Sequence, residues 1–220
     1  MSSILVEAAV DSLAAALAAV EAGAGRIELC ADLDAGGLTP PPALLAELRP
    51  RTQVPIFPMI RARAGSFHCT SDELDLMHAQ LRELTALGAD GFVFGALAAD
   101  NTIDTTATAG LIKEARDLPV TFHRAFDRTP DLATSLDALK ALGAARVLTS
   151  GGKDRAADAI PELVQLTEHA AGRIGILPGG SVTEANVLEI TRATGVKEVH
   201  ARCGPDGRRV SGILHALRYL

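Results

Sequence analysis

The sequence predicts an α/β fold: a single (β/α)8 barrel of the TIM type spanning residues 1–220. Short apolar runs alternate with Ala- and Leu-rich amphipathic stretches, and eight such units follow one another at intervals of about 20 to 35 residues. Several of the amphipathic stretches end at a glycine just before the next apolar run, at Gly23, Gly88, Gly143 and Gly195. The first turn lacks G-x-G-x-x-G, which disfavours an open doubly wound sheet.

Eight apolar runs are expected to form the strands, because each is short, rich in Ile, Val, Leu or Phe, and followed by turn residues. In chain order they are residues 4–9 (ILVEAA), 26–30 (RIELC), 55–61 (PIFPMIR), 91–95 (GFVFG), 120–126 (VTFHRAF), 146–150 (RVLTS), 174–178 (IGILP) and 197–202 (KEVHAR).

Eight helices are expected between and after these strands. They cover residues 11–23, 41–49, 71–88, 105–116, 131–142, 154–171, 183–193 and 209–219. Three of them begin with residues typical of helix N-caps, namely Ser71 before two acidic residues, Asp131 after a proline, and Thr183 before a glutamate.

Composition excludes several classes of function. The net charge is −6 without a basic run, aromatic residues make up 3%, and Trp is absent, so nucleic-acid binding is not expected. No apolar run reaches the roughly 18 residues of a membrane span, and the N-terminus lacks the basic start of a signal peptide. Three cysteines do not suggest a disulfide framework. We expect a cytoplasmic protein whose Ala-rich helical surface allows a homo-oligomer.

Strand periodicity predicts which side chains point into the barrel. Apolar residues that must contact helices set the phase, and the alternate positions then face the lumen. Five charged or imidazole side chains from five strands fall on that inner face, late in their strands: Glu7, Glu28, Arg61, His123 and His200. We expect them to meet at the carboxyl end of the barrel, where TIM barrels hold their active sites. A self-paired polar layer without activity is the alternative.

Two glycine-rich strand ends suggest an anion site. Ser150 and Gly151 follow the sixth strand, and Gly179 and Gly180 follow the seventh. Such loops leave backbone N–H groups free to hold an anion, although tight-turn geometry explains them equally well.

These residues together suggest an enzyme for a small anionic molecule. Arg61 and Arg63 could clamp a carboxylate or phosphate. Glu28 or Glu7 could act as general base and His123 or His200 as acid, with Asp127 orienting His123 or a loop arginine. Proton abstraction, isomerisation and hydrolysis all remain open.

Several stretches resemble the CutC family of copper homeostasis proteins. The resemblance runs from about residue 4 to residue 200 and is most specific at 120–127 (VTFHRAFD) and 146–151 (RVLTSG). The other matching segments are 23–30 (GAGRIELC), 36–40 (GGLTP), 58–63 (PMIRAR), 178–180 (PGG) and 198–200 (EVH). It implies a cytoplasmic TIM-type barrel, often oligomeric, that handles copper, with an unidentified enzymatic activity also open.

The resemblance makes Cys30 the candidate ligand for Cu(I), which prefers soft sulfur. Some relatives carry a second cysteine just after the first-strand glutamate, where this chain has Ala8 and Ala9. We therefore expect weak copper affinity that depends on Cys30. A larger sulfur cluster of Cys30, Met59, Cys69 and Cys203 is conceivable, but no C-x-x-C supports it.

Overall fold

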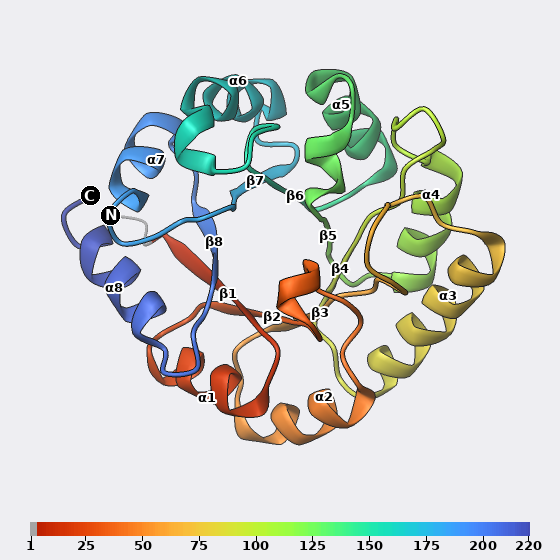
Figure 1. Cartoon of the computed structure of the whole chain (residues 1–220), viewed down its shortest axis with the longest axis horizontal. Helices are drawn as coiled ribbons and strands as arrows, with labels where there is room; N and C mark the ends of the chain where they lie inside the picture. The colour runs from red at the N-terminus through yellow and green to blue at the C-terminus, as the bar shows by residue number, and fades with distance from the viewer. Residues whose placement is uncertain (1–3) are drawn as a thin grey trace.

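A computed structural model describes residues 4–220 and shows the expected (β/α)8 architecture, with parallel strands forming an inner ring and helices around it (Figure 1). The strands are β1 (Leu5–Val10), β2 (Arg26–Leu29), β3 (Ile56–Pro58), β4 (Phe92–Phe94), β5 (Val120–Phe122), β6 (Arg146–Thr149), β7 (Gly175–Pro178) and β8 (Glu198–Arg202). They form two four-stranded parallel sheets, β3-β2-β1-β8 and β4-β5-β6-β7, which a bridge between Met59 and Val93 joins.

The outer ring contains α1 (Leu13–Glu21), α2 (Pro42–Leu48), α3 (Ser71–Ala86), α4 (Thr105–Ala115), α5 (Leu132–Leu142), α6 (Ile160–Ala170), α7 (Val187–Thr194) and α8 (Arg208–Leu217). None of these helices has the length and apolar character needed to cross a membrane.

The expected caps are partly confirmed. Asp131 caps α5 by accepting from the Thr134 N–H. The cap of α3 is Thr70 rather than Ser71, because Thr70 forms a reciprocal capping box with Glu73. The prediction at Thr183 is wrong: this residue precedes a turn at residues 184–186, and α7 begins only at Val187.

The strand predicted for residues 120–126 ends early. β5 stops at Phe122, and residues Arg124–Arg128 form a 3-10 helix whose N-cap is His123. The His123 ring accepts a hydrogen bond from the Ala125 N–H, which turns the chain out of the sheet. Side chains after His123 therefore no longer follow the alternation of a strand.

The interior confirms the predicted strand phase. Ile27, Leu29 and Phe122 belong to the large cluster between strands and helices. A separate small cluster fills part of the lumen with Cys30, Phe57, Met59 and Val93. The alternation of apolar residues was therefore sufficient to separate the two faces of the strands.

The seam between β7 and β8 lies next to two glycines. A Cβ at Gly175 would lie 3.0 Å from Glu198 Oε1, and one at Gly179 would lie 3.3 Å from His200 Cδ2. These glycines leave room for the β8 side chains, and the two strands form no ladder within the described residues. Gly179 thus makes space for an imidazole inside the barrel.

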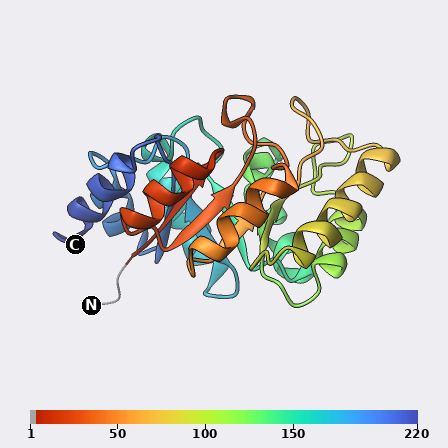
Figure 2. The same ribbon diagram turned by 90° about the horizontal axis from the view of Figure 1, so that it is seen from below.

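The loops after β2 and β3 extend beyond one end of the ring (Figure 2). The short 3-10 helix Leu33–Ala35 in the first of these loops lies over the centre of the strand ring in Figure 1. Leu33 packs on the cluster inside the barrel. This loop therefore covers part of the carboxyl-terminal mouth.

Candidate functional site

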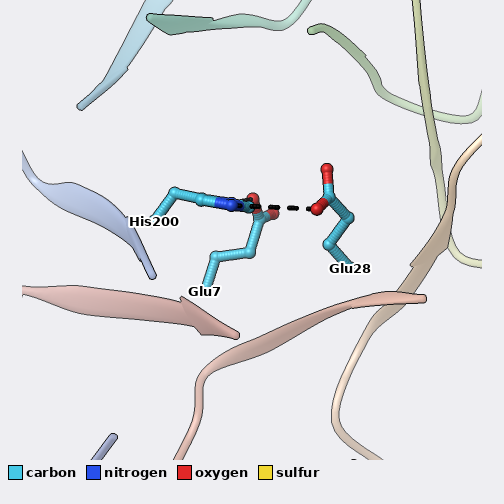
Figure 3. Close-up of side chains that lie close together, drawn as sticks. All are labelled: Glu7, Glu28 and His200. Atoms are coloured by element: carbon cyan, nitrogen blue, oxygen red, sulfur yellow. Dashed lines mark hydrogen bonds and ion pairs between the residues drawn. The ribbon is translucent and has the colours of Figure 1, made fainter. Parts of the chain in front are cut away.

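Three side chains from β1, β2 and β8 meet inside the barrel (Figure 3). His200 Nδ1 lies 2.8 Å from Glu7 Oε1, and His200 Nε2 lies 3.8 Å from Glu28 Oε2. The strand register explains the meeting, because Glu7 is paired with His200 across the β1–β8 ladder. These three are the one group of at least three His, Cys, Asp or Glu side chains in residues 4–220 with metal-ligand spacing.

Glu7 is completely buried and is held by an arginine that the sequence analysis did not single out. Arg26 is paired with Glu7 in the β1–β2 register, and its Nε donates to Glu7 Oε2. Burial alone would raise the pKa of Glu7, but Arg26 and His200 outweigh it and hold that pKa below its usual range. Glu7 is therefore an ionised partner that orients His200.

Arg26 also joins a polar layer beneath this cluster. Its Nη2 donates to Glu198 Oε2 at 2.7 Å, and Arg146 Nε lies 3.3 Å from Glu198 Oε1. Both guanidinium groups lie 5.2 Å from the centre of the Phe57 ring. The buried charges are thus compensated in pairs.

Glu28 has the opposite environment to Glu7. It is 3% exposed, and burial raises its pKa to about 7, with His200 opposing and Glu7 adding to the shift. Its Oε1 has no hydrogen-bond partner among the described residues. The pKa of His200 is raised, because Glu28 and Glu7 outweigh the opposing effect of its own burial. The environment therefore favours the protonated form of His200 and places it beside a carboxyl group whose pKa is raised to about 7.

A cavity of about 560 Å³, here called the mouth cavity, opens above this pair. Its wall includes Glu28, Met59, His123, Arg124, Gly180, Ser181, Val182, His200 and Cys203. A second hollow of about 670 Å³, the rim cavity, adjoins it and is lined by Arg61, Phe67, Arg124, Asp127, Arg128 and Lys153 among others. Both hollows share Gly36, Phe67 and Arg124.

His123 enters the mouth cavity as a neutral ring. Burial, with the charge of Arg61, lowers its pKa to about 3. Because Nδ1 accepts from the Ala125 N–H, the single proton of the neutral ring resides on Nε2. That nitrogen has no partner among the described residues. His123 is therefore suited to donate a hydrogen bond to a bound molecule.

The two arginines expected to clamp an anion are engaged elsewhere. Arg61 lines the rim cavity, but its two terminal nitrogens donate to the carbonyls of residues 35, 37 and 65. Arg63 pairs with Glu73 and donates to the carbonyls of residues 64, 66 and 68. Arg61 therefore links the β2–α2 and β3–α3 loops, whereas Arg63 holds the β3–α3 loop alone and lies outside both cavities.

The loop after β6 is organised by Asp127. Its carboxylate accepts from the Thr149 hydroxyl and from the backbone N–H groups of Ser150 and Gly152. The Gly151 N–H donates to the Thr149 hydroxyl. These N–H groups are occupied within the protein, so Ser150 and Gly151 do not provide a free anion cradle. Asp127 contacts the loop and Arg124, not His123.

Arg124 lines both cavities. Its Nε lies 2.9 Å from Asp127 Oδ2, and its Nη2 donates to Ser150 Oγ at 2.6 Å. Gly179 and Gly180 flank it and His200: a Cβ at Gly180 would lie 3.4 Å from Arg124 Cζ. The 3-10 turn after β5 brings Arg124 to this position, which a pure strand alternation could not predict.

The sulfur atoms do not form one cluster. Cys30 is fully buried, and its thiol donates to Glu28 Oε2 at 3.6 Å. Met59 packs beside it, while Cys69 contacts Met77 and Cys203 donates to the Gly204 carbonyl. Burial and the neighbouring Glu28 raise the pKa of the Cys30 thiol, which disfavours the thiolate that binds copper.

Comparisons with known proteins agree with this fold. The copper homeostasis protein cutC homologs of Mus musculus and Homo sapiens are each 42% identical over 212 residues, covering 96% of this chain and 77% of theirs. The crystal structure of the putative copper homeostasis protein CutC from Streptococcus agalactiae matches with a TM-score of 0.86 and 35% identity, over 90% of this chain and 97% of that one.

Thiamine phosphate pyrophosphorylase from Pyrococcus furiosus, at 13% identity and a TM-score of 0.66, shares the fold alone; it covers 99% of this chain and 97% of its own. The family model described as the CutC family matches residues 4–204. This chain therefore belongs to the CutC family of copper homeostasis proteins.

Proposed function

We propose that this protein is an enzyme that transfers protons on a small anionic molecule bound in the mouth cavity. One observation carries the proposal: Glu28, a buried carboxyl group, lies 3.8 Å from a histidine that a second carboxylate holds, and burial raises the pKa of Glu28 to about 7. Perturbed acid and base groups that face a cavity are typical of catalytic sites.

His200 is the candidate general acid. Glu7 fixes the ring through Nδ1, so the imidazolium directs its Nε2 proton towards the cavity and Glu28. The carboxylate also stabilises the charged ring, because Glu7 stays ionised over the physiological range. Geometry and charge both favour proton donation from Nε2.

Glu28 is the candidate general base. In its ionised form it accepts a proton from a carbon next to a substrate carbonyl, while His200 gives a proton to the carbonyl oxygen. One proton leaves and one arrives, so the product is an enediol or enol, and reversal at the neighbouring carbon gives an isomer. The neutral His123 ring donates a hydrogen bond to the same molecule.

Exchange of substrate protons with deuterium tests this proposal. Phosphorylated and carboxylated hydroxy-ketones and aldehydes are incubated with the protein in D2O, and deuterium incorporation is followed by proton NMR. We expect one class to exchange, with Glu28→Gln reducing the rate by roughly 100-fold or more. Glu168→Gln, at an exposed position of α6, is the control. Exchange by Glu28→Gln at the rate of the unmodified protein would contradict the proposal, as would no exchange across the panel.

Copper binding is the second candidate, supported by family membership and by the neighbouring positions of the Cys30 and Met59 side chains. A Cβ at Gly37 would lie 3.2 Å from Cys30 Sγ and 3.3 Å from Met59 Cε, so the two sulfur side chains face the same spot. We propose weak Cu(I) binding there, in the reducing cytoplasm where three free cysteines are stable.

Anaerobic titration with Cu(I) against a competing chelator checks the copper proposal. Cys30→Ser should weaken binding by at least about tenfold, since it removes the only thiol at this position. Cys69→Ser is the matched control, because Cys69 contacts Met77 instead. Equal affinity in the unmodified protein and Cys30→Ser would eliminate Cys30 as a copper ligand.

A further inference from the structure

One wall of the mouth cavity combines a fixed cation with unused backbone donors. Arg124 is anchored through Nε by Asp127 and through Nη2 by Ser150 and the Lys153 carbonyl. Its remaining terminal nitrogen, Nη1, has no hydrogen bond to any residue within 4–220. The guanidinium is therefore preorganised with a free donor beside the cavity that it lines.

The loop after β7 provides the backbone donors. Gly180 and Ser181 both have left-handed backbone conformations, with φ of 90° and 58°. Successive backbone N–H groups in a turn form a concavity suited to an anion, and residues 180 and 181 lie in such a bend. No described residue accepts a hydrogen bond from the N–H groups of Gly180, Ser181 or Val182, and all three residues line the mouth cavity. This contrasts with the loop after β6, whose N–H groups Asp127 occupies.

Two buried polar atoms belong to residues that line the same cavity and give a second, independent indication of a ligand. His123 and Glu28 are each 3% exposed, and His123 Nε2 and Glu28 Oε1 have no partner among the described residues. Buried polar atoms without protein partners are unfavourable unless an ordered water, an ion or a bound molecule satisfies them. The cavity of about 560 Å³ is large enough for a small metabolite.

We propose that the mouth cavity binds the phosphate group of a phosphorylated substrate between the Arg124 guanidinium and the backbone N–H groups of residues 180–182. This inference rests on the proposed enzymatic function and names its substrate class. Phosphate offers one more acceptor oxygen than a carboxylate, so it can accept from the guanidinium and from the backbone N–H groups at the same time. Gly179 separates this position from His200, so the phosphate end lies beside the acid–base pair.

Binding of inorganic phosphate, followed by amide NMR and calorimetry, tests the inference. We expect saturable binding at millimolar concentrations, with the largest shifts at the amides of residues 180–182. Arg124→Gln should weaken binding by about tenfold or more. Arg128→Gln is the matched control, because it removes the same charge from the same segment but lines only the rim cavity. Its affinity should stay within about twofold.

The inference would be overturned by the absence of saturable phosphate binding, by shifts confined to the rim cavity, or by equal weakening in both arginine variants. Acetate at matched ionic strength should bind more weakly, and equal binding would replace phosphate by carboxylate as the ligand. The amide shifts of the unmodified protein keep the test valid even if Arg124→Gln is unstable.

The phosphate test and the exchange test fail separately. Phosphate binding that depends on Arg124 without Glu28-dependent exchange would keep the anion site and remove the acid–base function. Glu28-dependent exchange on a substrate without phosphate would keep the acid–base function and remove the phosphate site.

Discussion

Replacing Glu7 with Gln tests the buried charge network that orients His200. Glu7 is completely buried and Arg26 is 4% exposed, so the substitution leaves a buried guanidinium with Glu198 as its remaining carboxylate partner. Breaking one arm of such a network should destabilise the fold by about 3 kcal/mol. For a chain of this length that corresponds to a fall in melting temperature of about 6 to 12 °C.

The effect of Glu7→Gln should depend on pH. The lowered pKa of Glu7 adds stability that is present above its unfolded value of 4.5 and is lost as the pH falls. The raised pKa of His200 adds stability that is fully present below 6.5 and is lost as the pH rises through its folded value. The loss on substitution should therefore be largest between pH 4.5 and 6.5.

Urea unfolding across this pH range measures the loss, and proton NMR of the histidine rings measures the pKa of His200. The variant should show a lower pKa for His200, because a neutral amide replaces the carboxylate. Glu168→Gln, at an exposed site, should change the stability by less than about 0.5 kcal/mol. An unchanged pKa of His200, or equal stability of Glu7→Gln and the unmodified protein in this window, would refute the reasoning.

Three further substitutions test the surroundings of the site. Glu28→Gln should raise the free energy of unfolding by about 3 kcal/mol at pH 8, because the buried carboxylate is unfavourable there. At pH 4, where the carboxyl group is neutral, the gain should be much smaller. Urea unfolding measures both values, and a variant less stable than the unmodified protein at pH 8 would argue against this. Gly179→Ala should lower the free energy of unfolding by about 2 kcal/mol, because its Cβ would lie 2.5 Å from Leu148 Cδ1. Thermal melting measures this loss, and an unchanged melting temperature would show that the space between β7 and β8 accommodates the added methyl group. Asp127→Asn should lower the free energy of unfolding by about 2 kcal/mol and loosen the loop at Ser150, because an amide N–H₂ would face backbone N–H groups. Hydrogen exchange at the Ser150 amide measures this loosening, and an unaltered exchange rate would contradict the role of this carboxylate.

The fold and the inward positions of Glu28 and His200 were predictable, because they depend on the alternation of apolar and polar residues within single strands. Ile27 and Leu29 must face helices, so Glu28 between them must face the lumen, and the same argument holds for His200 after Val199. This reasoning needs only the two-residue period of a strand.

The pairing of the buried charges was not predictable, because it depends on the register between strands. Nothing local in β1 or β2 indicates that Glu7 lies opposite Arg26, yet this pairing separates the ionised carboxylate from the titrating one. The positions of the two loop arginines could not be predicted either, because strand alternation does not apply to them. Arg61 donates to loop carbonyls, and a 3-10 turn places Arg124 beside the cavities.

The titration of the Glu28 side-chain carboxyl carbon, followed by ¹³C NMR in the unmodified protein, tests the central claim most directly. A buried acid that exchanges protons at neutral pH requires a midpoint near pH 7. A midpoint near the ordinary value of 4.5 would show that burial does not raise the pKa of Glu28, and the acid–base site would then lose its titrating base.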